Sequence, residues 1–251
     1  MSAFERVALV TGSGSGLGRV TAMAFARDGY GVAVSDVNPE FGVETVATIR
    51  RAGGQASFFE ADVSQPAAVQ QLVADVASSF GSLHVAVNNA GIVGPSTPFH
   101  EYHYDAWDRL LAVNLTGVFL CMQSEVSHMR AAGGGAIVNV SSRAGLVGAA
   151  GRGGYAATKH GVVGLTRTAA VEYAGQGIRV NAVCPGAIMT PMLESVLAED
   201  PGSRARYEET SPMARLALPE EVADSIVWLC SPAASFINGA ALPIDGGAAA
   251  R

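Results

Sequence analysis

Short apolar runs alternate with longer segments of helical periodicity along this chain of 251 residues. The runs are rich in valine and are bounded by glycine and polar residues, which is typical of buried strands. They are residues 7–10, 31–35, 56–59, 83–87, 136–140, 179–183 and 240–244. Such strands, separated by helices, predict βαβ crossovers and a parallel sheet covered on both faces. We therefore predict an α/β, doubly wound Rossmann fold of about seven parallel strands.

One segment departs from this alternation. Residues 186–216 form a long irregular insertion in which apolar residues such as Met189 and Met192 stand among polar ones. Long loops in compact domains often cover active sites. No linker-like tract interrupts the chain elsewhere, so we expect residues 1–251 to form a single domain with residues 186–216 as its substrate lid.

Composition and charge narrow the class of protein. Hydrophobic residues make up 49% of the chain and charged residues 15%, which favours a large packed core and excludes a disordered chain. The formal net charge of −6 leaves no basic stripe for a phosphate backbone, so a small-molecule partner is favoured over nucleic acid. Cys121, Cys184 and Cys230 are widely spaced, which indicates unpaired thiols, most simply core thiols, in a reducing compartment.

We expect no targeting segment in this chain. Its first predicted strand begins within a few residues of the amino terminus, which leaves no room for a secretion signal. No uninterrupted apolar stretch reaches the ~18 residues needed to span a bilayer. We expect a cytoplasmic protein with no membrane partner.

A glycine-rich loop follows the first predicted strand and precedes a helical pattern, with glycines in the order Gly-x-x-x-Gly-x-Gly. In that context, backbone amides and a helix N-terminus bind a pyrophosphate. A flexible Gly/Ser turn has a similar composition, but two buried elements flank this one. We expect a dinucleotide to bind at Gly12, Ser15, Gly16, Leu17 and Gly18.

Asp36 ends the second predicted strand, where a dinucleotide-binding fold places the acid that accepts hydrogen bonds from the adenosine ribose. The same carboxylate repels a 2′-phosphate, and no basic residue stands at Ser15 or Val37 to bind one. The sequence therefore predicts NAD in preference to NADP, with Asp36 and Val37 in the site. A turn aspartate before Asn38 is a compatible second role for Asp36.

Loops after the third and fourth strands offer further cofactor residues. Asp62 and Val63 follow the third strand, where Asp62 either lines an adenine pocket or caps the following helix, and the sequence favours neither. Asn89, Ala90 and Gly91 follow the fourth strand and let the chain approach a cofactor closely, although a plain turn has the same composition.

Four polar residues carry the candidate chemistry: Asn114, Ser142, Tyr155 and Lys159. Tyr155 and Lys159 lie four residues apart, so a helix places both side chains on one face. A tyrosine with an ordinary pKa of ~10 is a poor base until a nearby cation favours the phenolate, and Lys159 supplies one. The Ser142 hydroxyl is expected to emerge at the carboxyl end of the fifth strand. Each residue alone is more often structural, but their order and spacing indicate an oxidoreductase.

Together these motifs resemble the short-chain dehydrogenase/reductase family over the whole chain. The glycine loop, residues 88–91, the four polar residues and the Pro-Gly pair at 185–186 all occur in the family's order. The resemblance implies that Tyr155 is the catalytic acid/base and that Ser142 holds the substrate oxygen. It also implies that Lys159 binds the nicotinamide ribose and lowers the tyrosine pKa, and that Asn114 anchors a water in a proton relay.

The same resemblance assigns the remaining cofactor contacts and the assembly. Near the nicotinamide it implies Pro185, Gly186, Ile188 and Thr190. At the adenosine half it implies Val63 together with Asn89 or Ala90. It further implies a homotetramer.

The substrate pocket is expected beside Ser142 and Tyr155, among apolar residues of three segments: Val93, Ala149, Met189 and Met192. An apolar lining favours a hydrophobic secondary alcohol or ketone, although methionines in the lid equally suit simple packing. Residues 117–122 and 190–193 most resemble family members that act on alicyclic alcohols and diols. Arg143 and Arg152 flank the catalytic segment and could receive a carboxylate or a phosphate. An acidic substrate is the minority alternative, because exposed arginines near a loop are usually solvated.

Two rival functions stay open. A 3-ketoacyl carrier-protein reductase shares the four polar residues, but that reaction generally uses NADPH, which Asp36 disfavours. A non-catalytic dinucleotide-sensing protein shares the fold, although such proteins often lack one of the four. No metal is expected, because His100 and His103 form an HxxH pair without a third ligand.

Overall fold

Seven parallel strands form one sheet in the computed structural model, which describes residues 5–200 and 202–250. Their order across the sheet is β3-β2-β1-β4-β5-β6-β7. The strands are β1 (Val7–Thr11), β2 (Gly31–Asp36), β3 (Gln55–Glu60), β4 (Val85–Asn88), β5 (Gly135–Val140), β6 (Ile178–Pro185) and β7 (Ala241–Ile244). Every predicted strand is present, with ends that shift by one or two residues, so the predicted fold class is confirmed.

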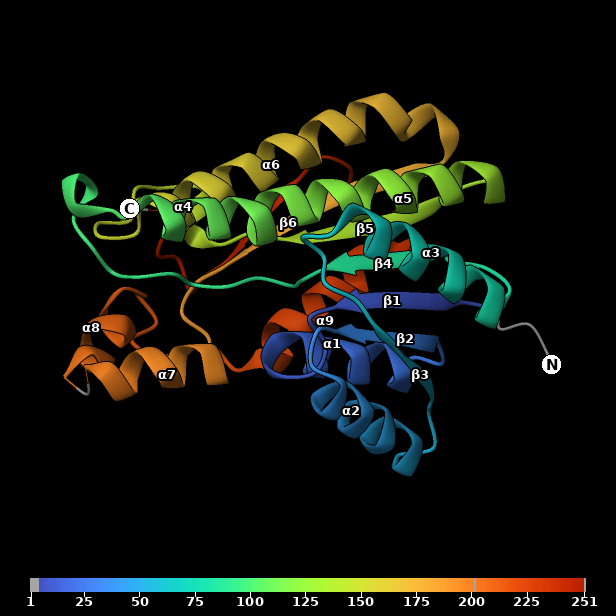
Figure 1. The fold of residues 1–251 in the computed structure, drawn as a ribbon, viewed down its shortest axis with the longest axis horizontal. Coiled ribbons are helices and arrows are strands. Elements are labelled where there is room, and N and C mark those ends of the chain that lie inside the picture. The colour runs from blue at the N-terminus through green and yellow to red at the C-terminus, as the bar shows by residue number, and fades with distance from the viewer. Residues whose placement is uncertain (1–4, 201, 251) are drawn as a thin grey trace.

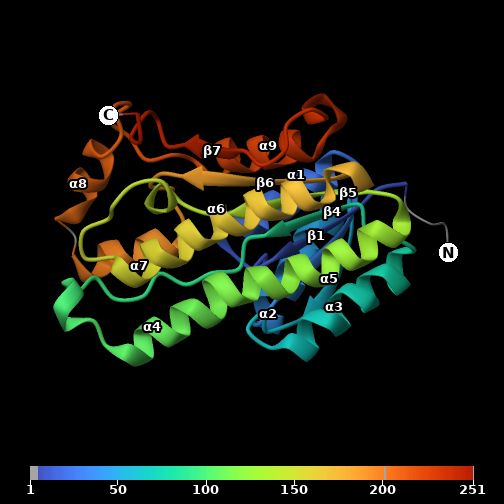
Figure 2. The ribbon, with the colours of Figure 1, turned by 90° about the horizontal axis from the view of Figure 1, so that it is seen from above.

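Helices cover both faces of the sheet (Figures 1 and 2). One face packs against α1 (Gly16–Arg27), α2 (Pro39–Arg51) and α9 (Pro219–Cys230), and the other against α3 (Pro66–Phe80), α5 (Gly117–Ala132) and α6 (Gly153–Tyr173).

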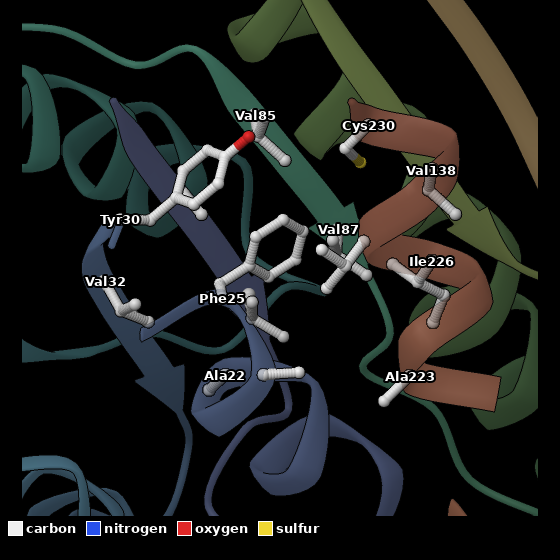
Figure 3. Close-up of a cluster of buried hydrophobic side chains, with 14 of the residues drawn as sticks. Ala22, Phe25, Tyr30, Val32, Val85, Val87, Val138, Ala223, Ile226 and Cys230 are labelled. Carbon is white, nitrogen blue, oxygen red and sulfur yellow. The ribbon is translucent and has the colours of Figure 1, made fainter. Parts of the chain in front are cut away.

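Two hydrophobic cores result, because alternate residues of a strand point to opposite faces. In β1, Val10 faces the core under α1 and α9, whereas Leu9 faces the core under α3, α5 and α6. Figure 3 shows the first of these cores, with Phe25 of α1 and Ile226 of α9 gathered around Val87 of β4.

A continuous helix runs from Tyr104 to Ala132 through α4 (Tyr104–Leu110), a π-helical segment (Leu111–Thr116) and α5. By length and composition alone this helix could cross a membrane, with 29 residues and a mean hydropathy of 1.3, but half of its apolar window is buried. Buried core helices meet the same criterion, and Val126 and Met129 belong to the second core. Charged residues interrupt the helix, which is why the sequence shows no uninterrupted apolar run there.

The segment 186–216, predicted to be irregular, contains two helices, α7 (Pro191–Glu199) and α8 (Ser203–Glu209). The Thr190 side chain caps α7 by accepting from the backbone N–H of Leu193, and Pro191 occupies the first turn. A threonine followed by proline is an ordinary helix-start signal, so the prediction of irregular structure is wrong. A β-bridge between Ile188 and Ala217 joins the two ends of the segment, and Figure 1 shows α7 and α8 standing at one end of the molecule.

Candidate active site

The loops after β1 and β4 interlock where the strand order reverses, the usual ligand position in such sheets. Asn89 Nδ2 donates to the carbonyl oxygens of Thr11 (2.9 Å) and Gly12 (3.0 Å). In return, Thr11 Oγ1 accepts from the backbone N–H groups of Asn89 (3.1 Å) and Ala90 (3.2 Å). The structure thereby brings two predicted cofactor loops side by side.

The glycine loop leaves room for backbone only. Gly12 and Gly16 have positive φ angles of 62° and 53°, which favour glycine. A Cβ on Gly18 would lie 2.2 Å from the Gly12 carbonyl oxygen. Helix α1 begins at Gly16, and its N-cap residue Ser15 makes no side-chain cap hydrogen bond to the described residues. The first-turn amides of α1 therefore suit an anion, so these residues fit a dinucleotide pyrophosphate.

Asp36 borders this loop with both carboxylate oxygens engaged. Its Oδ2 accepts from the backbone N–H of Gly14 (2.8 Å) and its Oδ1 from that of Asn38 (2.9 Å). The turn role of Asp36 is thus confirmed, and it orients the carboxylate toward the glycine loop.

Arg19 is a neighbour of the loop that the sequence reasoning missed. Its Nε donates to the Gly14 carbonyl oxygen (2.9 Å), and its Nη2 lies 2.8 Å from Glu44 Oε2. Glu44 thus pairs with this guanidinium beside the glycine loop. Because Arg19 lies on α1 and not in the loop, the sequence gave no signal for this role.

The other predicted cofactor residues lie around the same edge. Asp62 does not cap α3, because its carboxylate accepts from Ser64, and Gln65 is the N-cap residue, so the capping alternative is wrong. Val63 is buried in a small cluster with Val69 and Cys121.

The chain after β6 also reaches the glycine loop. The backbone N–H of Gly186, just after Pro185, donates to the Ile244 carbonyl oxygen (3.0 Å). A Cβ on Gly16 would lie 3.6 Å from Thr190 Cβ, so the start of segment 186–216 borders the loop. Two further predicted contacts, Leu17 and Ile188, are buried and partly buried, and both pack in the first core.

Ser142, Tyr155 and Lys159 come together from two elements. Ser142 lies just after β5, and its Oγ accepts from the backbone N–H of Ala144 (3.1 Å). Tyr155 and Lys159 share one face of α6, with Lys159 Nζ 5.5 Å from the centroid of the Tyr155 ring. The predicted convergence of serine, tyrosine and lysine is present.

Asn114 lies in the π-helical segment and is fully buried. Its Nδ2 donates to the Ile92 carbonyl oxygen (2.8 Å), and its Oδ1 accepts from the Ile92 backbone N–H (2.8 Å). A Cβ on Gly91 would lie 3.2 Å from Asn114 Oδ1 and 3.7 Å from Lys159 Nζ. Asn114 therefore fixes the loop after β4 beside the lysine, and its part in a water relay stays a prediction.

The electrostatics of the tyrosine differ from the expectation. Burial raises the pKa of Tyr155 above its ordinary value, and a hydrogen bond with Ser142 and the charge of Arg152 oppose that rise. Burial also lowers the pKa of Lys159 to about 8. The charge of Arg152 therefore helps to lower the tyrosine pKa, and the part of Lys159 in lowering it stays a prediction. Sequence reasoning weighed Arg152 as a solvated residue, yet its Nη1 donates to the Gly94 carbonyl oxygen (2.9 Å).

Known proteins are similar to this chain over nearly its whole length. Residues 12–249 match the profile of the family described as Enoyl-(Acyl carrier protein) reductase. The chain is 48% identical to cis-4-hydroxycyclohexanecarboxylate dehydrogenase of Sinomonas cyclohexanicum, over 97% of this chain and 96% of that protein. The chain belongs to the short-chain dehydrogenase/reductase family.

Other members of the short-chain dehydrogenase/reductase family are similarly close. Cyclohexanol dehydrogenase of Acinetobacter sp. (strain SE19) is 44% identical, over 96% of this chain and 94% of that protein. The crystal structure of levodione reductase superposes with a TM-score of 0.94 at 39% identity and covers 99% of both chains. That of a single-residue variant of actinorhodin polyketide ketoreductase with NADPH has a TM-score of 0.94 at 35% identity and covers 98% of both chains. This chain is therefore an oxidoreductase of the short-chain dehydrogenase/reductase family.

The substrate side of this short-chain dehydrogenase/reductase is less defined. Val93, Ala149 and Met189 are partly buried, whereas Met192 is 42% exposed. Among the described residues, no recorded hydrogen bond or ring contact joins these four to the catalytic residues, so the pocket lining stays a prediction. Within residues 5–200 and 202–250, no group of three or more His, Cys, Asp or Glu residues could hold a metal. All three cysteines are buried and unpaired, as predicted for core thiols.

Proposed function

We propose that this protein is an NAD-dependent dehydrogenase that interconverts a hydrophobic alicyclic secondary alcohol and its ketone. The observation that carries the proposal is the convergence of Ser142, Tyr155 and Lys159 at the sheet edge that also bears the glycine loop. Relatives named for the oxidation of cyclohexanol and of a hydroxycyclohexanecarboxylate support the substrate class.

The chain's own groups divide the chemistry among them. Tyr155 takes the proton of the substrate hydroxyl in the oxidative direction and returns it in reduction, while Ser142 donates a hydrogen bond to the same oxygen. General acid–base transfer of this kind contributes about 10²- to 10⁴-fold. Lys159 holds the cofactor ribose, and Asn114 and Ile92 keep the loop after β4 in place around it. When bound, NAD supplies the acceptor for the hydride that leaves the carbinol carbon.

NAD is favoured over NADP by the charges around the adenosine end. The Asp36 carboxylate lies beside the glycine loop and would repel a 2′-phosphate, and Arg19 is paired with Glu44. Val37, the residue after Asp36, is exposed and carries no charge. One similar structure contains NADPH, so the preference rests on the residues of this chain rather than on its relatives.

The experiment is a turnover screen that follows NADH absorbance with linear, aromatic and alicyclic secondary alcohols and either NAD or NADP. Tyr155→Phe is the control, since it removes the proton-transferring hydroxyl and keeps the ring. NADH formation on a ring alcohol that depends on Tyr155 supports the proposal. Full turnover by Tyr155→Phe, or turnover with NADP alone, contradicts it.

A ketoacyl reductase is the second candidate, because actinorhodin polyketide ketoreductase shares the fold and 35% of the sequence. Its test is NADPH oxidation with an acetoacetyl thioester. Faster turnover there than with any ring alcohol and NAD favours the second candidate over the first.

A further inference from the structure

Arg152 lies between the loop after β4 and the start of α6. It is the N-cap residue of α6 and stands three residues before Tyr155. Its Nη1 donates to the Gly94 carbonyl oxygen (2.9 Å), next to the predicted pocket residue Val93. The backbone N–H of Thr97 donates to the Gly151 carbonyl oxygen (2.9 Å), which fastens the same two segments together. The guanidinium is therefore held at a fixed place near the reacting tyrosine.

The charge of Arg152 has no carboxylate partner in the described part of the chain, where the seven recorded ion pairs involve other residues. An arginine offers five N–H donors in a planar fork that matches a carboxylate, and one donor of Arg152 is used by Gly94. The charge of Arg152 also acts on two phenols. Burial raises the pKa values of Tyr155 and Tyr102, and this charge opposes both rises.

Tyr102 provides a second polar group at the same place. Its hydroxyl is buried, and among the described residues it has no hydrogen-bond partner. A Cβ on Gly94 would lie 3.3 Å from this hydroxyl, and a Cβ on Gly154 would lie 3.0 Å from it. A buried hydroxyl without a partner is unfavourable, and an anion drawn in by Arg152 would supply the missing acceptor.

We infer that Arg152 binds a carboxylate on the ring of the substrate, with the Tyr102 hydroxyl as a second donor. The substrate class is then a hydroxylated alicyclic carboxylic acid and its keto acid. This inference rests on the proposed function, because it takes the alcohol oxygen to lie at Ser142 and Tyr155. A carboxylate held away from the reacting carbon would fix the ring's orientation with binding energy that does not enter the proton transfer.

The test compares two substrates of equal ring size that differ in charge: 4-hydroxycyclohexanecarboxylate and its methyl ester, each with NAD. We expect the wild-type protein to have the higher kcat/KM for the acid. Arg152→Gln should reduce the acid-to-ester ratio of kcat/KM by about 10- to 100-fold, mainly through KM, because it removes a hydrogen-bonded charge. Arg152→Lys should restore part of the ratio, and Tyr102→Phe should lower it by less.

Arg143→Gln is the matched control, since Arg143 is an arginine on the same catalytic segment that follows Ser142 directly. It should leave the acid-to-ester ratio unchanged. Because the Arg152 charge also acts on Tyr155, the ratio is measured across a pH profile rather than at one pH. A second readout needs no turnover: calorimetric binding of cyclohexanecarboxylate to the NADH complex should weaken in Arg152→Gln and persist in Arg143→Gln.

The outcomes separate this inference from the proposed function. If neither the acid nor the ester nor cyclohexanol is oxidised, the proposed function fails. If the ester and cyclohexanol are oxidised as well as the acid, the proposed function stands and the inference is overturned. If Arg152→Gln lowers kcat/KM equally for acid and ester, Arg152 acts as a positioning residue for the loop or the tyrosine, which also overturns it.

Discussion

Lys159 Nζ donates a hydrogen bond of 2.9 Å to the carbonyl oxygen of Val140. Val140 is the last residue of β5, two residues before Ser142, and Lys159 lies on α6 one turn after Tyr155. A single hydrogen bond therefore links the helix that carries the tyrosine to the strand that leads to the serine. The ammonium that makes this bond belongs to the only lysine in the chain.

Replacing this lysine should affect both turnover and the pH dependence of stability. Lys159→Met should lower kcat by about 100-fold or more, because it removes a donor at the site of chemistry. The lysine pKa is about 8 in the folded protein against an ordinary 10.5, so the unfolded state binds more protons between those pH values. The free energy of unfolding of the wild type should therefore rise with pH across that window, and Lys159→Met should lack this rise.

Urea unfolding at the two ends of the window measures this difference. Since no other lysine is present, the alkaline titration of a lysine side chain can be assigned to this position. Equal changes in the free energy of unfolding in wild type and variant would contradict a buried lysine with a lowered pKa.

Cofactor preference should respond to the Asp36 charge. Asp36→Asn keeps one acceptor oxygen, which can serve the backbone N–H of Gly14 or of Asn38 but not both, and it removes the repulsion toward a 2′-phosphate. The ratio of kcat/KM for NAD over NADP should fall by about tenfold, which corresponds to ~1.4 kcal/mol. Asp62→Asn serves as the control, since the Asp62 carboxylate accepts from Ser64 instead. A similar fall in both variants would show that general charge, rather than the position of Asp36, sets the preference.

A methyl group at Gly18 should distort the predicted cofactor-binding loop. The added Cβ would stand 2.2 Å from the Gly12 carbonyl oxygen and 2.4 Å from Asn89 Nδ2, so both interlocked loops must move. Gly18→Ala should lower the melting temperature and weaken NADH binding, measured by fluorescence titration, by about tenfold or more. At Gly175 a Cβ would meet nothing within 4 Å, so Gly175→Ala should leave NADH affinity as it is. Undiminished NADH binding by Gly18→Ala would contradict the described loop.

The sheet was predictable because parallel strands are buried on both faces and appear as uninterrupted valine-rich runs. The glycine loop, Ser142, Tyr155 and Lys159 were predictable because their spacing along the chain places them at strand ends and on one helix face. The hydrogen bond that holds Arg152 in place was not, since its partner Gly94 lies 58 residues away in sequence. The helix at Pro191 was missed although Thr190 carries a capping signal, because apolar residues mixed with polar ones were taken for a loop.

A buried carboxyl group beneath the site should make stability fall with rising pH. Glu125 is fully buried, its Oε2 accepts from Asn88 Nδ2 (3.0 Å), and Asn88 also donates to Asn139 (2.9 Å). Burial raises the pKa of Glu125 from an ordinary 4.5 to about 7. Between these values the folded state keeps a proton that the unfolded state has lost, so the free energy of unfolding declines by about 3 kcal/mol across the window.

Glu125→Gln should flatten this decline, because the amide is neutral at every pH. Chemical unfolding at pH values below and above the window measures it, with Glu172→Gln as an exposed-carboxylate control. A decline that persists in Glu125→Gln would assign the proton to a different group.

Because of the π-helical segment Leu111–Thr116, the number of residues in this helix determines which way its side chains face. Each residue in an α-helix turns the chain by about 100°, so one wide turn changes the angular phase of everything that follows. The phase before and after the segment lets Asn114 face Ile92 while Val118 and Val126 still face the sheet. Deleting one residue there would make the helix more regular but would impair the protein. Either Asn114 would turn away from Ile92, or Val118 and Val126 would turn away from the sheet. Relatives should therefore vary in side chains along this stretch far more readily than in the number of residues.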